Sequence, residues 1–170
     1  IPTESLGDLT LLLDQVFFEK NNNKISEIFR EVFAPKLAIL IKDLQVYTND
    51  DDLTIKGVFG NEDLMHSLLN NIAIQIVNAK FASERYTTKT DGSKGRADIV
   101  IAKNNKGIVI EMKYNAKDAK IALEQAKDYA ELVKDNDIKI FMGCNITDQQ
   151  EVFISGEIVS SNESIYFDYP

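Results

Sequence analysis

The chain has 170 residues, of which 44% are hydrophobic and 27% charged, and its formal net charge is −8. These values are typical of one globular domain and exclude a collagen-like or low-complexity chain. No apolar run is long enough to cross a bilayer, and the single Cys144 excludes an internal disulfide and a cysteine-cluster zinc site. We therefore expect no membrane association and a reducing, cytoplasmic setting, with secretion into a host cell left open. Because the chain opens on Ile1 rather than Met, we also expect a domain cut from a longer protein.

The charges are unevenly distributed. Residues 1–79 carry 12 acidic against 6 basic residues, and residues 128–170 carry 9 against 2. Residues 80–127 carry 11 basic against 6 acidic residues and form the one basic zone. The overall acidity argues against tight autonomous binding of nucleic acid, which normally requires a basic surface. The acidic flanks would suit a protein partner, or they keep the chain in solution.

The first part of the chain has helical patterns. Helices are expected over 5–20, 25–33 and from residue 35 onward. Pro35 is expected to end the second helix and to separate it from the third. The acidic run at 49–52 predicts a loop. A further helix is expected after Asn61, which is a plausible N-cap. We divide the chain into an N-terminal helical segment, 1–60, which packs on the core or joins a missing upstream domain, and a core domain, 61–170.

The second part alternates strands with one strong helix. The expected elements are strands at 81–89, 96–103 and 106–114, a helix at 116–134, and strands at 137–144 and 151–156. This order predicts an α/β fold in which a central mixed sheet is flanked by helices.

The stretch GRADIVIAKNNKGIVIEMKY, residues 95–114, places three charges on otherwise apolar strands: Asp98, Glu111 and Lys113. A charge on a buried strand is costly unless it is paired or bound to a metal. If residues 104–105 form a two-residue hairpin loop, Asp98 faces Glu111 with side-chain roots roughly 5 Å apart, and Lys113 shares their face.

Other loop lengths remain open at this stage. A four-residue loop puts Asp98 opposite Lys113, and a three-residue loop moves Asp98 to the other face. Both faces of these strands carry apolar residues, so hydrophobicity does not fix the register.

Two opposed carboxylates in an apolar sheet repel each other, and the repulsion raises one pKa. A divalent cation of the Mg²⁺ type would remove the conflict and hold a water as nucleophile. Lys113 would then orient that water and neutralise charge that develops on a phosphate. Asp98, Glu111 and Lys113 are thus consistent with a metal site that hydrolyses phosphodiesters. The alternative is that they are ordinary strand-end charges paired with one another.

The stretch at 95–114 resembles the Asp…Glu-x-Lys core of the PD-(D/E)XK nuclease superfamily, whose fold is restriction-endonuclease-like. The segment QAKDY, 125–129, resembles the Q-x-x-x-Y motif of RecB-like members. The segment GNE, 60–62, followed by His66, is similar to the subfamily appended to AAA-ATPase-like domains of bacterial proteins. The resemblance covers about residues 60–155 in order and spacing.

The resemblance implies roles for individual residues. The metal, Mg²⁺ or Mn²⁺, would be held by Asp98, Glu111, the Met112 carbonyl and Glu62. The catalytic residues would be Asp98, Glu111, the catalytic lysine Lys113 and Gln125. A nucleic-acid contact is implied for Tyr129. From the residues themselves, Arg96, Lys94 and Lys117 are expected to contact nucleic acid, or they belong to an ordinary charged surface. From the residues alone, we expect a hydrogen-bonded structural role for His66 and a core position for Tyr86.

The leading functional hypothesis is a metal-dependent deoxyribonuclease, with DNA favoured over RNA because most of the resembling family acts on DNA. The alternative is a catalytically silent member that serves as a protein- or nucleic-acid-binding module. A third hypothesis keeps the nuclease chemistry within a toxin-like protein that an inhibitory partner holds inactive.

Overall fold

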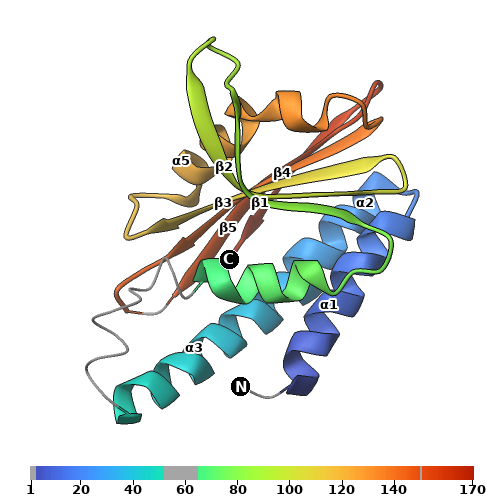
Figure 1. The fold of residues 1–170 in the computed structure, drawn as a ribbon. Coiled ribbons are helices and arrows are strands. Elements are labelled where there is room, and N and C mark those ends of the chain that lie inside the picture. The colour runs from blue at the N-terminus through green and yellow to red at the C-terminus, as the bar shows by residue number, and fades with distance from the viewer. Residues whose placement is uncertain (1–2, 52–64, 150) are drawn as a thin grey trace.

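The computed structural model describes residues 3–51, 65–149 and 151–170. They contain a six-stranded sheet in the order β1-β2-β3-β4-β5-β6 (Figure 1). The strands are β1 (Lys80–Thr88), β2 (Lys94–Lys103), β3 (Lys106–Tyr114), β4 (Ile138–Ile146), β5 (Val152–Val159) and β6 (Ser164–Tyr169). β3 and β4 run parallel and the other neighbours antiparallel. The prediction of an α/β fold with a mixed sheet flanked by helices is confirmed at this level.

Helical segments pack on both faces of the sheet. One layer contains α1 (Thr3–Phe18), α2 (Asn22–Glu27), the π-helix η1 (Ile28–Phe33), α3 (Ala34–Asp51) and the helix at 65–74. The other contains α5 (Ala119–Asp128) and the 3₁₀ turn η2 (Ala130–Val133). Within the described ranges, no helix combines the length and apolar character that crossing a membrane requires.

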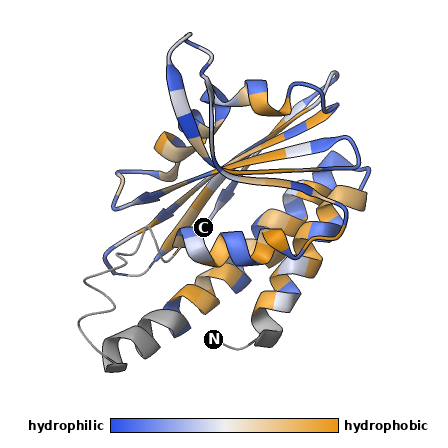
Figure 2. Ribbon diagram, in the orientation of Figure 1, coloured by the Kyte–Doolittle hydropathy of each residue, from blue (hydrophilic) through white to orange (hydrophobic). Residues whose placement is uncertain are grey.

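Two apolar clusters hold the layers together, and Figure 2 shows apolar residues along the strands and along the helices that pack on them. The larger cluster joins the N-terminal helices to the sheet. In it, Phe29 of η1 stacks on Phe167 of β6 with ring centroids 5.4 Å apart. The smaller cluster lies between the sheet and α5 with η2. Residues 3–51 therefore share one core with the strands.

The predicted break at Pro35 is wrong. η1 runs directly into α3, and Pro35 is the second residue of α3. Because the helix is continuous here, Pro35, which has no N–H, leaves a carbonyl of the preceding turn without its usual main-chain donor. The wider π turn ends where the Ala34 N–H donates to the Phe29 carbonyl. The expected loop at 49–52 also differs, because α3 continues to Asp51.

Two elements of the second half differ from expectation. The helix expected over 116–134 is divided: α5 ends at Asp128, Tyr129 leaves the helical conformation, and η2 follows. The edge strand β6 was not predicted, although its isoleucine, phenylalanine and two tyrosines are residue types that favour strands. It pairs antiparallel with β5 and supplies Phe167 to the larger core cluster.

Candidate functional site

The connection between β2 and β3 is a two-residue loop. Asn104 and Asn105 have φ values of 53° and 62°, and Lys103 pairs directly with Lys106. Positive φ at both central positions is the geometry of the tightest hairpin turns, and asparagine tolerates it well. The two-residue alternative is confirmed, and the three- and four-residue loops are excluded.

β2 and β3 separate at Asp98. Their pairing extends from the loop to Ile99 opposite Ile110, whereas β2 stays paired with β1 as far as Lys94. In Figure 1 the β1–β2 hairpin projects away from the rest of the sheet. The Asp98 carboxylate lies where the ladder ends: its Oδ2 accepts a hydrogen bond from the Met112 N–H at 2.9 Å. The Asp98 N–H in turn donates to Glu111 Oε1 at 3.4 Å.

The alternation of side chains along β2 is interrupted at the same point. Ala97 belongs to the apolar cluster under α5, whereas Ile99 belongs to the cluster on the opposite side. In a regular strand, two residues this far apart would share one face. Across the ladder on β1, Glu84 has a left-handed φ of 53° and breaks the run of pairs between Ser83 and Arg85. Such local distortions redirect side chains and are frequent beside functional sites.

Glu111 is the buried member of the carboxylate pair, with 4% of its surface exposed. Burial raises the pKa of Glu111 to about 9, the hydrogen bond and negative charge of Asp98 add to this effect, and the charge of Lys113 opposes it. A neutral Glu111 is therefore favoured near pH 7 unless a cation joins the pair. The two residues lie together as the sequence predicts, although the β2–β3 ladder ends before it would pair Asp98 with Glu111 directly.

Met112 and Lys113 continue β3 past the carboxylates. The N–H and C=O of one strand residue point to the same side, so the Met112 carbonyl faces the gap that its N–H faces. Lys113 is half-buried and lies opposite Asn145 of β4. The Asn145 side chain accepts from the Ala116 N–H at 3.1 Å and donates to the Ala116 carbonyl at 2.9 Å. Asn145 thereby fixes the loop that follows Lys113, a role that no sequence pattern indicated.

Tyr129, which directly follows α5, approaches the pair from one side. Tyr129 is 6% exposed, and its pKa is raised by burial and by the negative charge of Glu111. A side-chain carbon on Gly95 would come within 2.8 Å of the Tyr129 hydroxyl, so the absence of a side chain there lets the ring lie under β2. Gln125 is half-buried and, within the described residues, makes no hydrogen bond to Asp98 or Glu111.

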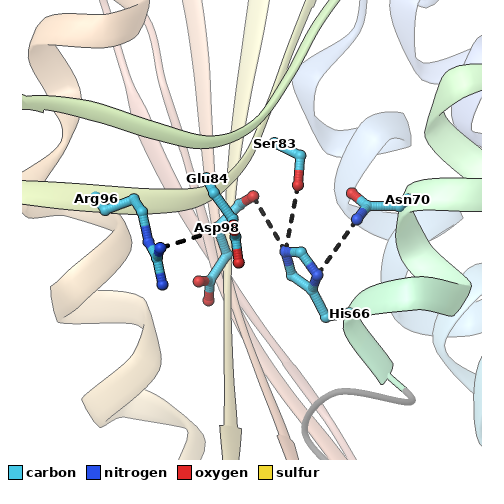
Figure 3. Close-up of polar contacts among 6 residues, drawn as sticks. All are labelled: His66, Asn70, Ser83, Glu84, Arg96 and Asp98. Carbon is cyan, nitrogen blue, oxygen red and sulfur yellow. Dashed lines mark hydrogen bonds and ion pairs between the residues drawn. The ribbon is translucent and has the colours of Figure 1, made fainter. Parts of the chain in front are cut away.

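His66 lies on the other side of the site and contacts main chain (Figure 3). Its Nε2 is 3.4 Å from the Asp98 carbonyl oxygen and 3.4 Å from Ser83 Oγ. The Asn70 side-chain nitrogen is 3.3 Å from His66 Nδ1. Because a carbonyl oxygen only accepts, Nε2 carries the proton of the Asp98 contact. His66 is thus hydrogen-bonded, as expected from the sequence, and it supports the backbone of Asp98 rather than its carboxylate.

The remaining predicted residues are spread more widely. Lys94 and Arg96 are exposed on the projecting part of β2. Lys117 is exposed and lines a separate pocket of about 460 Å³ beside β5 and β6. Glu62 lies outside the described residues. The core position expected for Tyr86 is wrong, because 75% of its surface is exposed.

Within the part of the chain that the structure describes, no group of three histidine, cysteine or acidic side chains is arranged to hold a metal ion. Asp98, Glu111 and the Met112 carbonyl supply three oxygen donors of the kind that Mg²⁺ prefers, and Mg²⁺ is commonly bound through only one or two carboxylates. The sequence matches no protein-family model, no curated protein and no solved structure in the comparisons made.

Proposed function

We propose that this chain is a divalent-metal-dependent nuclease of the PD-(D/E)XK type, with a restriction-endonuclease-like core, that hydrolyses DNA phosphodiester bonds. One observation carries the proposal: the buried Glu111 lies beside Asp98 at the point where β2 leaves β3. Lys113 lies two residues beyond Glu111 on the same strand. The order of these residues, Asp on one strand and Glu-x-Lys on the next, is that of the superfamily that the sequence resembles.

The residues fit a hard divalent cation. Glu111 is buried against a second carboxylate, an arrangement that is unfavourable for two negative charges and that a cation stabilises. Asp98, Glu111 and the Met112 carbonyl would hold Mg²⁺ or Mn²⁺, and Glu62 is proposed as a further acidic contact. A bound ion of this kind polarises a phosphate and lowers the pKa of a coordinated water.

The other side chains have supporting roles in this proposal. Lys113 would neutralise negative charge that accumulates on the phosphate as the bond to water forms. Gln125 would orient catalytic groups from α5, and Tyr129 would support β2 through its contact with Gly95. Lys94, Arg96 and Lys117 would contact the phosphate backbone, which positions a nucleic acid without reading its sequence.

Cleavage assays with purified protein test the proposal. Plasmid and single-stranded DNA are incubated with Mn²⁺, Mg²⁺ or EDTA, and RNA is included as a less favoured substrate. We expect cutting that requires the metal and that falls by about 100-fold or more in Asp98→Ala and Lys113→Ala.

Lys139→Ala is a matched control for Lys113→Ala. Lys113 lies beside the end of β4, whereas Lys139 lies near the start of β4, where it pairs with Val159. Its activity should equal that of the unaltered protein, and circular dichroism should show that all variants are folded. Cutting that persists in EDTA, or in Asp98→Ala, would contradict the proposal.

A second function remains a candidate because of one observation, the net charge of −8. A catalytically silent domain that binds a protein or a nucleic acid would also retain this fold. Nucleic-acid binding without metal and without cleavage would favour it. Inhibition of cleavage by a basic protein partner would instead favour a toxin-like nuclease under the control of an inhibitor.

A further inference from the structure

The projecting part of the β1–β2 hairpin, residues 84–97, is here named the arm. Its tip is tied to the end of α5, because the Thr90 N–H donates to the Asp128 carbonyl at 3.0 Å. Gly95 of the arm lies against Tyr129, and Lys89 Nζ is 5.7 Å from the centre of the Tyr129 ring. The arm is therefore braced along one side by buried structure.

The arm presents an aromatic side chain to solvent. Tyr86 is 75% exposed and pairs directly across the ladder with Arg96. The Arg96 guanidinium carbon is 5.9 Å from the centre of the Tyr86 ring, which is within the range of a cation–π contact. Together they place an aromatic ring and a guanidinium side by side on the surface of the arm. An exposed tyrosine at this position is able to contact a ligand.

This surface lies on the strand that carries the candidate site. Arg96 is two residues from Asp98, a separation of roughly 7 Å along a strand. Arg96 Nη1 is also 3.7 Å from Glu84 Oε2, and Figure 3 shows the Arg96 side chain directed towards Glu84 and Asp98. A molecule that rests on Tyr86 would therefore lie next to the carboxylate pair.

The charge of this region suits a polyanion. Residues 80–97 contain five basic and two acidic residues in a chain whose net charge is −8. One of the two acids, Asp91, is held within the tip, where its carboxylate accepts hydrogen bonds from the N–H and the hydroxyl of Ser93 at 2.9 and 2.6 Å. Exposed aromatic rings within a basic groove are the elements by which proteins bind single-stranded nucleic acid.

We propose that Tyr86 and Arg96 form a stacking site for one unpaired base of a DNA strand whose phosphate lies at Asp98 and Glu111. This inference rests on the proposed nuclease function and adds a substrate class to it: single-stranded DNA or the frayed end of a duplex. The base lies on the Tyr86 ring, and Arg96 contacts the adjacent phosphate. The bases of an intact duplex are already stacked on one another and gain nothing from this site.

Binding in EDTA tests the site separately from catalysis. A labelled single strand that carries 2-aminopurine is titrated with protein at fixed salt, and both anisotropy and 2-aminopurine emission are recorded. We expect Tyr86→Ala and Tyr86→Leu to weaken single-strand binding by about tenfold and to remove the change in emission that reports stacking. Tyr86→Phe should retain both, and blunt duplex binding should be unchanged in all variants.

Tyr166→Leu is the matched control, because Tyr166 is a 44% exposed tyrosine on β6, away from the arm. It should bind single strands like the unaltered protein. Equal single-strand affinity in Tyr86→Leu and the unaltered protein would overturn the inference, as would a complete lack of single-strand binding. Stacking without any cleavage in Mn²⁺ would support the site and overturn the nuclease proposal, so the two failures are distinguishable.

Discussion

Gly143 of β4 lies directly opposite Glu111 of β3, and the backbone of α5 packs against it. A side-chain carbon at Gly143 would come within 2.2 Å of the Leu123 nitrogen and 2.6 Å of the Ala122 carbonyl carbon. Both atoms are main chain, so neither can move without moving the helix. The position of α5 over the carboxylates therefore depends on the absence of a side chain at this residue.

We expect Gly143→Ala to lower the free energy of unfolding by roughly 1–3 kcal/mol, because the added carbon forces α5 away from β4. Gly7→Ala is the control: no atom lies within 4 Å of the added carbon, and alanine in a helix is favoured by about 0.5–1 kcal/mol. Urea denaturation measures both. Equal stability of Gly143→Ala and the unaltered protein would show that α5 is not seated as described.

The stability of the metal-free protein should depend on pH through Glu111. Its folded-state pKa of about 9 lies above the ordinary value of 4.5, so the folded state binds more protons between these values. Stability is therefore greatest below about pH 4.5 with respect to this group, and it falls as the pH rises towards 9. Glu111→Gln cannot ionise. It should match the unaltered protein near pH 4.5 and exceed its stability by on the order of 3 kcal/mol at pH 7.

Thermal and urea unfolding of Glu111→Gln in EDTA across this pH range provide the measurement. Glu163→Gln, at an exposed position, serves as the control and should show a small difference that does not vary with pH. A constant difference between Glu111→Gln and the unaltered protein would contradict the assigned pKa.

Metal binding should release a proton. At pH 7 Glu111 is mostly protonated in the metal-free protein, and an ion can bind its carboxylate only after the proton leaves. We expect close to one proton to be released per Mn²⁺. As long as the pH is below the pKa of Glu111, the affinity for Mn²⁺ should rise about tenfold with each unit of pH increase. Calorimetry in two buffers with different enthalpies of ionisation measures the release. If the heats are identical in the two buffers, Glu111 does not exchange its proton for the metal.

Glu84 adopts a left-handed backbone conformation that glycine accepts more readily. Glu84→Gly should raise the free energy of unfolding by about 1 kcal/mol, because it relieves this strain and loses only a partly exposed ion pair with Arg96. Thr88→Gly, on the same strand without a positive φ, should instead lower it. If both glycine variants lose the same stability, strain at Glu84 is absent.

Much of the hairpin that carries the site could be predicted from sequence. The pair Asn104-Asn105 indicated a tight loop, and the loop fixes the register that brings Asp98 towards Glu111. The change of face at Asp98 could not be predicted. Both faces of β2 carry apolar residues, so the sequence pattern does not indicate which face of the sheet each residue occupies.

Other features depend on contacts between distant segments. Tyr86 has a residue type common in strands and in cores, but it lies on the edge strand β1 and is exposed. The two hydrogen bonds between the Asn145 side chain and the Ala116 main chain join residues 29 apart in sequence. The restriction-endonuclease-like core and the roles of Lys113 and Gln125 remain predictions until the cleavage assays are done.

The stacking of Phe29 on Phe167 has a consequence for biosynthesis. The two rings are separated by most of the chain, and Phe29 emerges from the ribosome long before its partner. Such contacts form late, because the intervening segment must first be made and ordered. The helical layer of the nascent protein therefore exposes an aromatic surface until β6 has been synthesised.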